Sequence, residues 1–184
     1  MKIYVIELPV VEKITYNGIK SNKIKDSITE NLQLRSRSSY DEIILKKDNE
    51  KIITTLRNLG YYFAEIETFI ETKENNKIDI RYEINLGDKA KIKKISFIGN
   101  KIFKDNKLKR IIVSEEYKFW KFISGKKFLN ENLNKLDLRL LKNYYLTKGY
   151  YNVEINSSFA KMLSSNEFEL VFNIDAKNKI YFGN

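Results

Sequence analysis

The chain of 184 residues carries 34 Lys and Arg against 24 Asp and Glu, for a formal net charge of +10, and contains no Cys and no His. The absence of both residue types excludes disulfides, thiol nucleophiles, histidine general bases and the usual zinc sites, so we expect no metal and no other cofactor. No apolar run reaches the length of a membrane-spanning helix, and the start of the chain is too short and too quickly charged to be a signal peptide.

The positive charge belongs to one half of the chain. Residues 1–89 contain 15 Lys and Arg and 15 Asp and Glu, whereas residues 90–184 contain 19 and 9, so the whole excess of ten lies there. An electrostatic partner would therefore meet the second half. The alternative is that solvated lysines reflect the Lys-, Asn- and Ile-rich composition of the chain.

The first half predicts a β-α-α-β-β domain over residues 10–88. Residues 1–9 end at Pro9 and are interpreted as the last strand of a preceding domain. The apolar periodicities that follow predict strands over 11–17, 63–72 and 77–86 and helices over 21–34 and 39–59. Ser39 with Glu42 is a capping-box signature for the second helix. One face of the third strand carries Ile78, Ile80, Tyr82 and Ile84.

The second half repeats this order over residues 89–178. Strands are predicted over 92–100, 151–159 and 167–174. A short helix begins near Asp105 and carries Leu108, Ile111 and Ile112, and a longer helix is capped by Asn130. The long helix is expected to bury one stripe, formed by Leu133, Leu136, Leu140, Leu141 and Tyr144. Residues 179–184 are interpreted as the start of a following domain or a linker.

The joint between the second helix and the second strand occurs twice in nearly the same form. Gly60 and Gly149 are each followed by Tyr-Tyr and, after two further residues, by Glu-Ile. A glycine at this place can end a helix in the left-handed conformation at little steric cost. An internal repeat of this length indicates two domains rather than one.

The order of elements also predicts the sheet. Two antiparallel helices return the chain so that strands one and three run parallel, and the short hairpin makes strands two and three antiparallel neighbours. The predicted fold class is α+β, with two tandem domains that each hold a three-stranded mixed sheet in the order 1-3-2, covered on one face by two helices. Strand two then lies at an edge.

Two successive units of this kind resemble the POTRA domains of the Omp85/BamA family of outer-membrane protein assembly factors, most of all the second and third POTRA domains. The resemblance covers nearly the whole chain and is carried by residues 95–101, by Phe119-Trp120 with Gly125-Lys126-Lys127, and by residues 141–150. The family's glycine after strand three is present as Gly87 but replaced by Lys177, so a tight junction is less expected at Lys177.

The resemblance implies a non-catalytic scaffold in the periplasm of a Gram-negative bacterium, ahead of a covalently attached β-barrel missing from this chain. It implies unfolded outer-membrane proteins and accessory lipoproteins of the assembly machinery as partners. An enzyme is not expected, because no pair of carboxylates is marked by a motif. Glu65 and Glu154, at matching places in the two repeats, are expected to face solvent.

Two strand edges are the candidate binding sites, because an edge strand can pair with an extended segment of another chain, which is called β-augmentation. The alternative is that both edges are merely solvated or covered. The primary candidate consists of Tyr151, Asn152, Val153, Glu154, Ile155, Asn156, Ser157 and Ser158. The secondary candidate consists of Phe63, Ala64, Glu65, Ile66, Glu67, Thr68 and Phe69.

A loop of alternating aromatics and lysines is the third candidate, formed by Phe119, Trp120, Lys121 and Phe122. It could contact a lipoprotein or a membrane surface, or its aromatics could fold back onto the domain. Basic residues between aromatics also suit single strands of nucleic acid, so a basic single-stranded nucleic-acid-binding module is the alternative function. No RNP-like aromatic pair flanked by Arg and no Gly-rich phosphate loop supports it, and nucleic acid is not expected as a partner.

Overall fold

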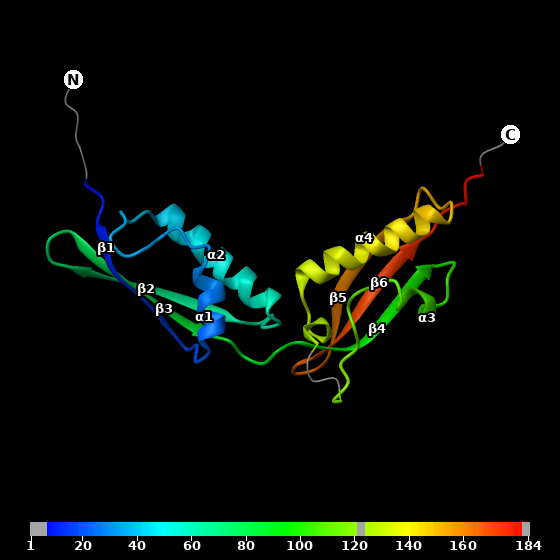
Figure 1. The fold of residues 1–184 in the computed structure, drawn as a ribbon, viewed down its shortest axis with the longest axis horizontal. Helices are drawn as coiled ribbons and strands as arrows, with labels where there is room; N and C mark the ends of the chain where they lie inside the picture. Colours follow the sequence, from blue (N-terminus) through cyan, green and yellow to red (C-terminus); the bar gives the residue numbers. More distant parts are fainter. Residues whose placement is uncertain (1–6, 121–123, 182–184) are drawn as a thin grey trace, which may run out of the picture. The chain divides into compact units, whose positions relative to one another are not determined.

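The computed structural model describes residues 7–120 and 124–181, without the side chains of residues 100 and 158–161. The chain divides into two compact units, Met1–Arg57 with Phe63–Gly87 and Asn58–Tyr62 with Asp88–Asn184, which are described separately (Figure 1). The interpretation of residues 1–9 as a preceding strand falls mainly on residues 1–6, which lie outside the described residues. Residues 182–184 also lie outside them, and residues 179–181 are not part of a strand.

The first unit has the predicted element order. It consists of β1 (Val10–Asn17), α1 (Asn22–Thr29), α2 (Glu42–Asn58), β2 (Glu65–Lys73) and β3 (Lys77–Asn85). The sheet order is β1-β3-β2, with β1 parallel and β2 antiparallel to β3, as predicted. Figure 1 shows both helices on the same face of the sheet. The predicted apolar face of β3 is confirmed, because all four of its members are buried: Ile78, Ile80, Tyr82 and Ile84.

Two details of the first unit differ from the prediction. Helix α1 ends at Thr29 rather than near Leu34, because the backbone N–H groups of Gln33 and Leu34 bond a carboxylate on α2 instead of continuing the helix. The cap of α2 is Asp41, whose Oδ1 accepts from the N–H of Ile43 at 2.7 Å and that of Ile44 at 3.2 Å. The capping-box prediction at Ser39 is therefore wrong, and Ser39 instead forms an isolated β-bridge with Val10.

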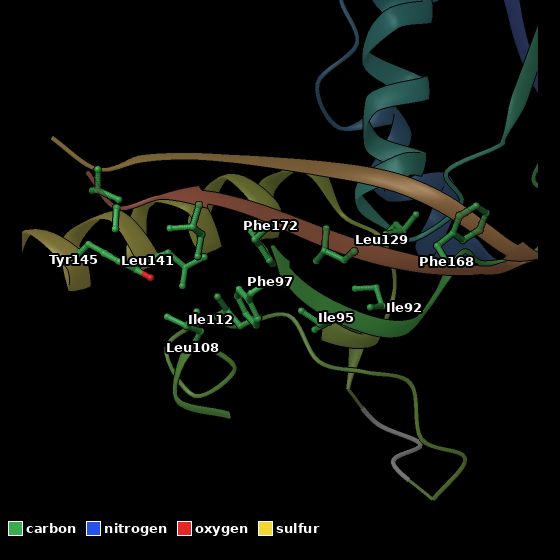
Figure 2. Close-up of a cluster of buried hydrophobic side chains, with 14 of the residues drawn as sticks. Ile92, Ile95, Phe97, Leu108, Ile112, Leu129, Leu141, Tyr145, Phe168 and Phe172 are labelled. Carbon is green, nitrogen blue, oxygen red and sulfur yellow. The ribbon is translucent and has the colours of Figure 1, made fainter. Parts of the chain in front are cut away.

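The second unit repeats the architecture. It consists of β4 (Lys91–Asn100), α3 (Asp105–Leu108), a 3-10 turn (Gly125–Lys127), α4 (Glu131–Thr147), β5 (Glu154–Ser164) and β6 (Glu167–Asp175). The sheet order β4-β6-β5 again confirms the prediction. Figure 2 shows side chains of both helices meeting those of the strands in one core, where the rings of Phe97 and Phe172 stack at 5.4 Å. Asn130 caps α4, as predicted, by accepting from the N–H of Leu133.

The helices of the second unit differ in two ways from the prediction. Helix α3 has four residues, so Ile111 and Ile112 follow it rather than lie on it. The fully buried face of α4 consists of Asn134, Asp137, Leu141 and Tyr145, whereas Leu133, Leu136, Leu140 and Tyr144 are only partly buried. Of the predicted stripe, the burial of Leu141 is confirmed, but the rest of the buried face is displaced around the helix, because apolar periodicity alone ignores polar residues that are buried with hydrogen-bond partners.

The repeated joint has the predicted backbone. Gly149 has φ +88°, the N–H of Tyr150 bonds the carbonyl of Tyr145 at 3.1 Å, and that of Gly149 bonds the carbonyl of Leu146 at 3.0 Å. This is a Schellman motif. Gly60 has φ +96° at the matching place. The departure at Lys177 does not change the backbone, since its φ of +52° matches the +59° of Gly87.

Candidate functional site

The outer edge of β2 is a long and regular strand edge. All nine residues from Glu65 to Lys73 pair with β3 in one continuous register, from Glu65 opposite Asn85 to Lys73 opposite Lys77. In the part of the chain that the structure describes, no strand pairs with the other side of β2. Nine extended residues span about 30 Å. The backbone groups of this edge are therefore arranged to pair with a second extended segment.

The side chains of β2 place charge on one face and apolar surface beside it. Glu65, Glu67 and Glu71 are exposed on the same face of the strand as Phe69. The guanidinium of Arg81, on β3, lies 4.8 Å above the Phe69 ring and 3.5 Å from the Glu71 carboxylate. Of the seven residues in the secondary candidate, the five from Glu65 to Phe69 lie on the strand, whereas Phe63 and Ala64 precede it.

The edge formed by β5 is shorter than its sequence suggests. The strand begins at Glu154, so Tyr151 to Val153 of the primary candidate precede it, and Val153 is buried in the core. Glu154 to Ser158 pair regularly with β6, after which the register shifts twice. Such bulges twist a strand and interrupt the ladder, which is one way in which proteins protect an edge. The regular part of this edge therefore has five residues.

Each edge strand is joined to the helix beneath it by a side-chain hydrogen bond that sequence reasoning missed. In the first unit, the hydroxyl of Thr68 on β2 donates to the amide oxygen of Asn49 on α2 at 3.2 Å. In the second, the amide nitrogen of Asn134 on α4 donates to the hydroxyl of Ser157 on β5 at 2.6 Å. These bonds hold the edge against the helix. No periodicity marks them, since each joins one residue to one partner.

A buried aspartate also recurs in both units and was missed. Asp48 on α2 accepts hydrogen bonds from the N–H groups of Gln33 at 2.9 Å and Leu34 at 2.8 Å. Asp137 on α4 accepts from the N–H groups of Val113 at 2.6 Å and Ser114 at 3.3 Å.

Neither aspartate is accessible to solvent. Burial raises the pKa of Asp137, an effect that the bonds from Ser114 and Val113 partly offset. The signal was present in the sequence, because each aspartate stands twelve residues before the glycine of its joint, Gly60 or Gly149.

The aromatic loop of the second unit presents its first residues to solvent. Phe119 and Trp120 are 71% and 59% exposed and pack edge to face on one another at 4.7 Å. Lys118 lies 5.9 Å from the Trp120 ring. The alternative that the aromatics fold back onto the domain is therefore wrong for these two. Lys121 and Phe122 lie outside the described residues.

Glu116, which precedes this loop, is hydrogen-bonded to β4. The environment of its carboxylate predicts that this contact is lost at acid pH. Its Oε1 accepts from the N–H of Ile95 at 3.0 Å and from Nζ of Lys109 at 2.6 Å. Burial by itself raises the pKa of Glu116, but these two hydrogen bonds and the charges of Lys109 and Lys118 outweigh it, so the pKa lies below its usual value. A lowered carboxyl pKa gives stability that is present above the unfolded-state pKa.

We expect that stability to be lost as the pH falls from about 5 to 3. Glu116→Gln should therefore flatten the acid side of the pH profile of unfolding of the second unit, measured by urea titration of the intact chain with the amide resonances of that unit followed separately. Glu131→Gln, an exchange on the first turn of α4, serves as a control that should retain the wild-type slope. Identical profiles for Glu116→Gln and the wild type would contradict the prediction.

The described residues contain no group of three or more metal-binding side chains, and no helix among them is both long and apolar enough to cross a bilayer. What the two units have in common is a small mixed sheet with one face covered and a second strand, β2 or β5, whose outer side pairs with no other strand among the described residues. This arrangement defines a class of tandem α+β modules that present strand edges.

The chain belongs to the POTRA family, whose model, described as a surface antigen variable number repeat, matches residues 9–87 and 90–177. It is 25% identical to the outer membrane protein assembly factor BamA of Buchnera aphidicola over 154 residues. The matched region covers 82% of this chain and 25% of the relative. BamA of Neisseria meningitidis is also 25% identical over 154 residues, which are 82% of this chain and 19% of that protein. The chain thus spans a quarter or less of these relatives.

Solved structures show the same fold. POTRA domains 3–5 of Haemophilus influenzae BamA match with a TM-score of 0.60 and 16% identity over 93% of this chain and 67% of theirs. POTRA domains 1–2 of Omp85 from Anabaena match with a TM-score of 0.54 and 12% identity over 95% of this chain and 97% of theirs. The fold of these POTRA domains therefore matches nearly the whole of this chain.

Proposed function

We propose that this chain is a non-catalytic segment of an outer-membrane protein assembly factor, located in the periplasm of a Gram-negative bacterium. In this role it binds extended segments of unfolded outer-membrane proteins, or of accessory lipoproteins, at the edges of β2 and β5. Membership of the POTRA family and similarity to proteins named as assembly factors support the scaffold role. The observation that carries the binding mode is the continuous nine-residue register of β2, with its outer side unpaired among the described residues.

An edge of this kind suits a partner that must accept many sequences. Backbone N–H and C=O groups are the same in every client, so they supply affinity without selecting a sequence. Selection comes only from alternate side chains, which here meet Glu65, Glu67 and Glu71 on one face of β2. A client strand with Lys or Arg at alternate positions would pair favourably with this face.

The two edges should differ in strength. β2 offers nine residues in register, and β5 offers five before its first shift. Because each added pair of residues contributes further backbone bonds, the longer edge holds a client segment more tightly. We therefore place the main binding edge on β2, which sequence reasoning ranked second, and the weaker one on Glu154 to Ser158.

The first test is a titration of the intact 15N-labelled chain with a ten-residue peptide that alternates apolar and polar residues. Amide resonances of Glu65 to Lys73 should shift or broaden at lower peptide concentration than those of Glu154 to Ser158. Shifts confined to Lys118 and its neighbours, or binding abolished by moderate salt, would favour an electrostatic partner instead and contradict edge binding.

Proline at neighbouring positions of β2 gives a matched pair of variants. Successive residues of an edge strand direct their N–H groups alternately inward to β3 and outward, so one of Ile70→Pro and Glu71→Pro removes an outward donor and the other an inward one. The outward variant should bind the peptide about fivefold more weakly and keep its fold, since one hydrogen bond is lost. The inward variant should lose stability. Unchanged affinity in both variants, with both folded, would contradict the proposal.

A further inference from the structure

Two loop tips of the second unit lie at the same end of the sheet, where β4 begins. The N–H of Tyr117 bonds the carbonyl of Ile92 at 2.6 Å, which places the start of the aromatic loop beside the first residues of β4. On the other side, the N–H of Lys91 bonds the carbonyl of Asn166 at 2.7 Å, which places the β5–β6 turn beside the same residues. Both tips can be followed at this end of the unit in Figure 1.

Both tips expose large apolar side chains. Phe119 and Trp120 are 71% and 59% exposed, and Met162 and Leu163, on the last residues of β5 before the turn, are 59% and 43% exposed. We call Phe119, Trp120, Met162 and Leu163 the two-tip surface. Large apolar residues gathered at exposed tips indicate an interaction surface, whereas single ones do not.

Lysines lie on the aromatic-loop side of the two-tip surface. Lys118 and Lys126 are exposed beside the aromatic tip. Lys91 and Lys127 lie on the Tyr117 ring at 5.0 and 5.1 Å. At the same end, burial and the nearby positive charge of Lys127 lower the pKa of Lys89. The acidic Glu167 is bonded to Lys93 at 3.0 Å and so adds little negative field. The end of the unit therefore combines apolar tips with positive charge.

We propose that the two-tip surface docks on the surface of an anionic phospholipid bilayer, with Phe119, Trp120 and Met162 entering the interface and Lys118 and Lys126 contacting lipid phosphates. Aromatic side chains favour the interfacial region, and each lysine near an anionic surface adds attraction. Two separate protruding tips fit a deformable bilayer better than a rigid protein surface, which would have to match both in shape. The two-tip surface includes no residue of the segments proposed to bind extended partners, 65–73 on β2 and 154–158 on β5, so the inference goes beyond the proposed function.

Trp120 is the sole tryptophan of the chain, so its fluorescence reports on this tip alone. The intact chain is titrated with vesicles of phosphatidylcholine and with vesicles that also contain phosphatidylglycerol. With the anionic vesicles, Trp120 emission should shift to shorter wavelength and the protein should co-sediment, and both effects should weaken at high salt. The absence of a shift with anionic vesicles, or equal binding to both kinds, overturns the proposal.

Charge reversal supplies the matched control. Lys118→Glu with Lys126→Glu should weaken binding to anionic vesicles by about tenfold or more, because two attractive charges become repulsive. Lys20→Glu with Lys23→Glu makes the same charge change at exposed positions of the first unit and should leave binding nearly unchanged. Equal losses in both double variants would show attraction by net charge alone and would overturn the assigned surface. A tip-specific response to an acidic protein but to no vesicle would also overturn it.

Discussion

Gly18→Ala is expected to lower the free energy of unfolding of the first unit by about 3 kcal/mol, because the new side chain meets backbone and the site is left-handed. A Cβ on Gly18 would lie 1.8 Å from the carbonyl oxygen of Ile84, and Gly18 has φ +84°. Ile84 belongs to β3, the central strand, which pairs with β2. The strand would have to move to accept a methyl group, so the edge itself would be disturbed.

Gly87→Ala separates the two causes of this loss. Gly87 also has a positive φ, +59°, but a Cβ there would have nothing within 4 Å. Its cost should therefore be about 1 kcal/mol, from backbone conformation alone. Hydrogen exchange of first-unit amides measures both variants within the intact chain, where a single unfolding curve would mix the two units. Equal losses in the two variants would contradict the role of the close contact.

Asp48→Ala is expected to cost about 3 kcal/mol, because it leaves two backbone N–H groups near the core without their acceptor. The carboxylate is fully buried and holds the residues that follow α1, Gln33 and Leu34, against α2. Asp137→Ala should have an effect of similar size in the second unit, where Val113 and Ser114 lose the same support. Hydrogen exchange of each unit reads the two losses separately.

Glu50→Ala is the control for this prediction, since it removes an exposed carboxylate from the same helix two residues away. Its effect should stay within about 0.5 kcal/mol. An equally small effect for Asp48→Ala would mean that water or another group replaces the carboxylate, and would contradict a structural role. Asp48→Asn should recover only part of the loss. Its one acceptor oxygen can take the place of Oδ2, which accepts from both N–H groups, but its NH2 group then replaces Oδ1, which also accepts from the N–H of Gln33 at 3.1 Å.

Much of the fold could be predicted because its signals are local. The glycines of the two joints end helices by their own backbone conformation, and Asn130 caps α4 with its own side chain. The apolar face of β3 follows from alternation along one strand. The errors arose where a distant partner decides the outcome. Helix α1 ends early because Asp48 captures its next N–H groups, and apolar periodicity could not find the buried face of α4, since two of its four members are polar.

The candidate sites divide in the same way. That each second strand lies at a sheet edge follows from element order and hairpin length, and both edges were found. The sequence did not predict which edge has the longer regular register, since the register shifts after Ser158 depend on how β5 meets β6 rather than on either sequence by itself. The outward position of Trp120 likewise depends on what the core leaves uncovered.

By itself, the sequence determined the repeat, the types and order of the elements and the 1-3-2 sheet, because periodicity, caps and hairpins act over a few residues. Only the tertiary structure decided which strand edge runs nine residues without interruption, which aspartates are buried and which aromatics protrude. Those features arise when segments far apart in the chain meet, and their energies depend on the partner as much as on the residue.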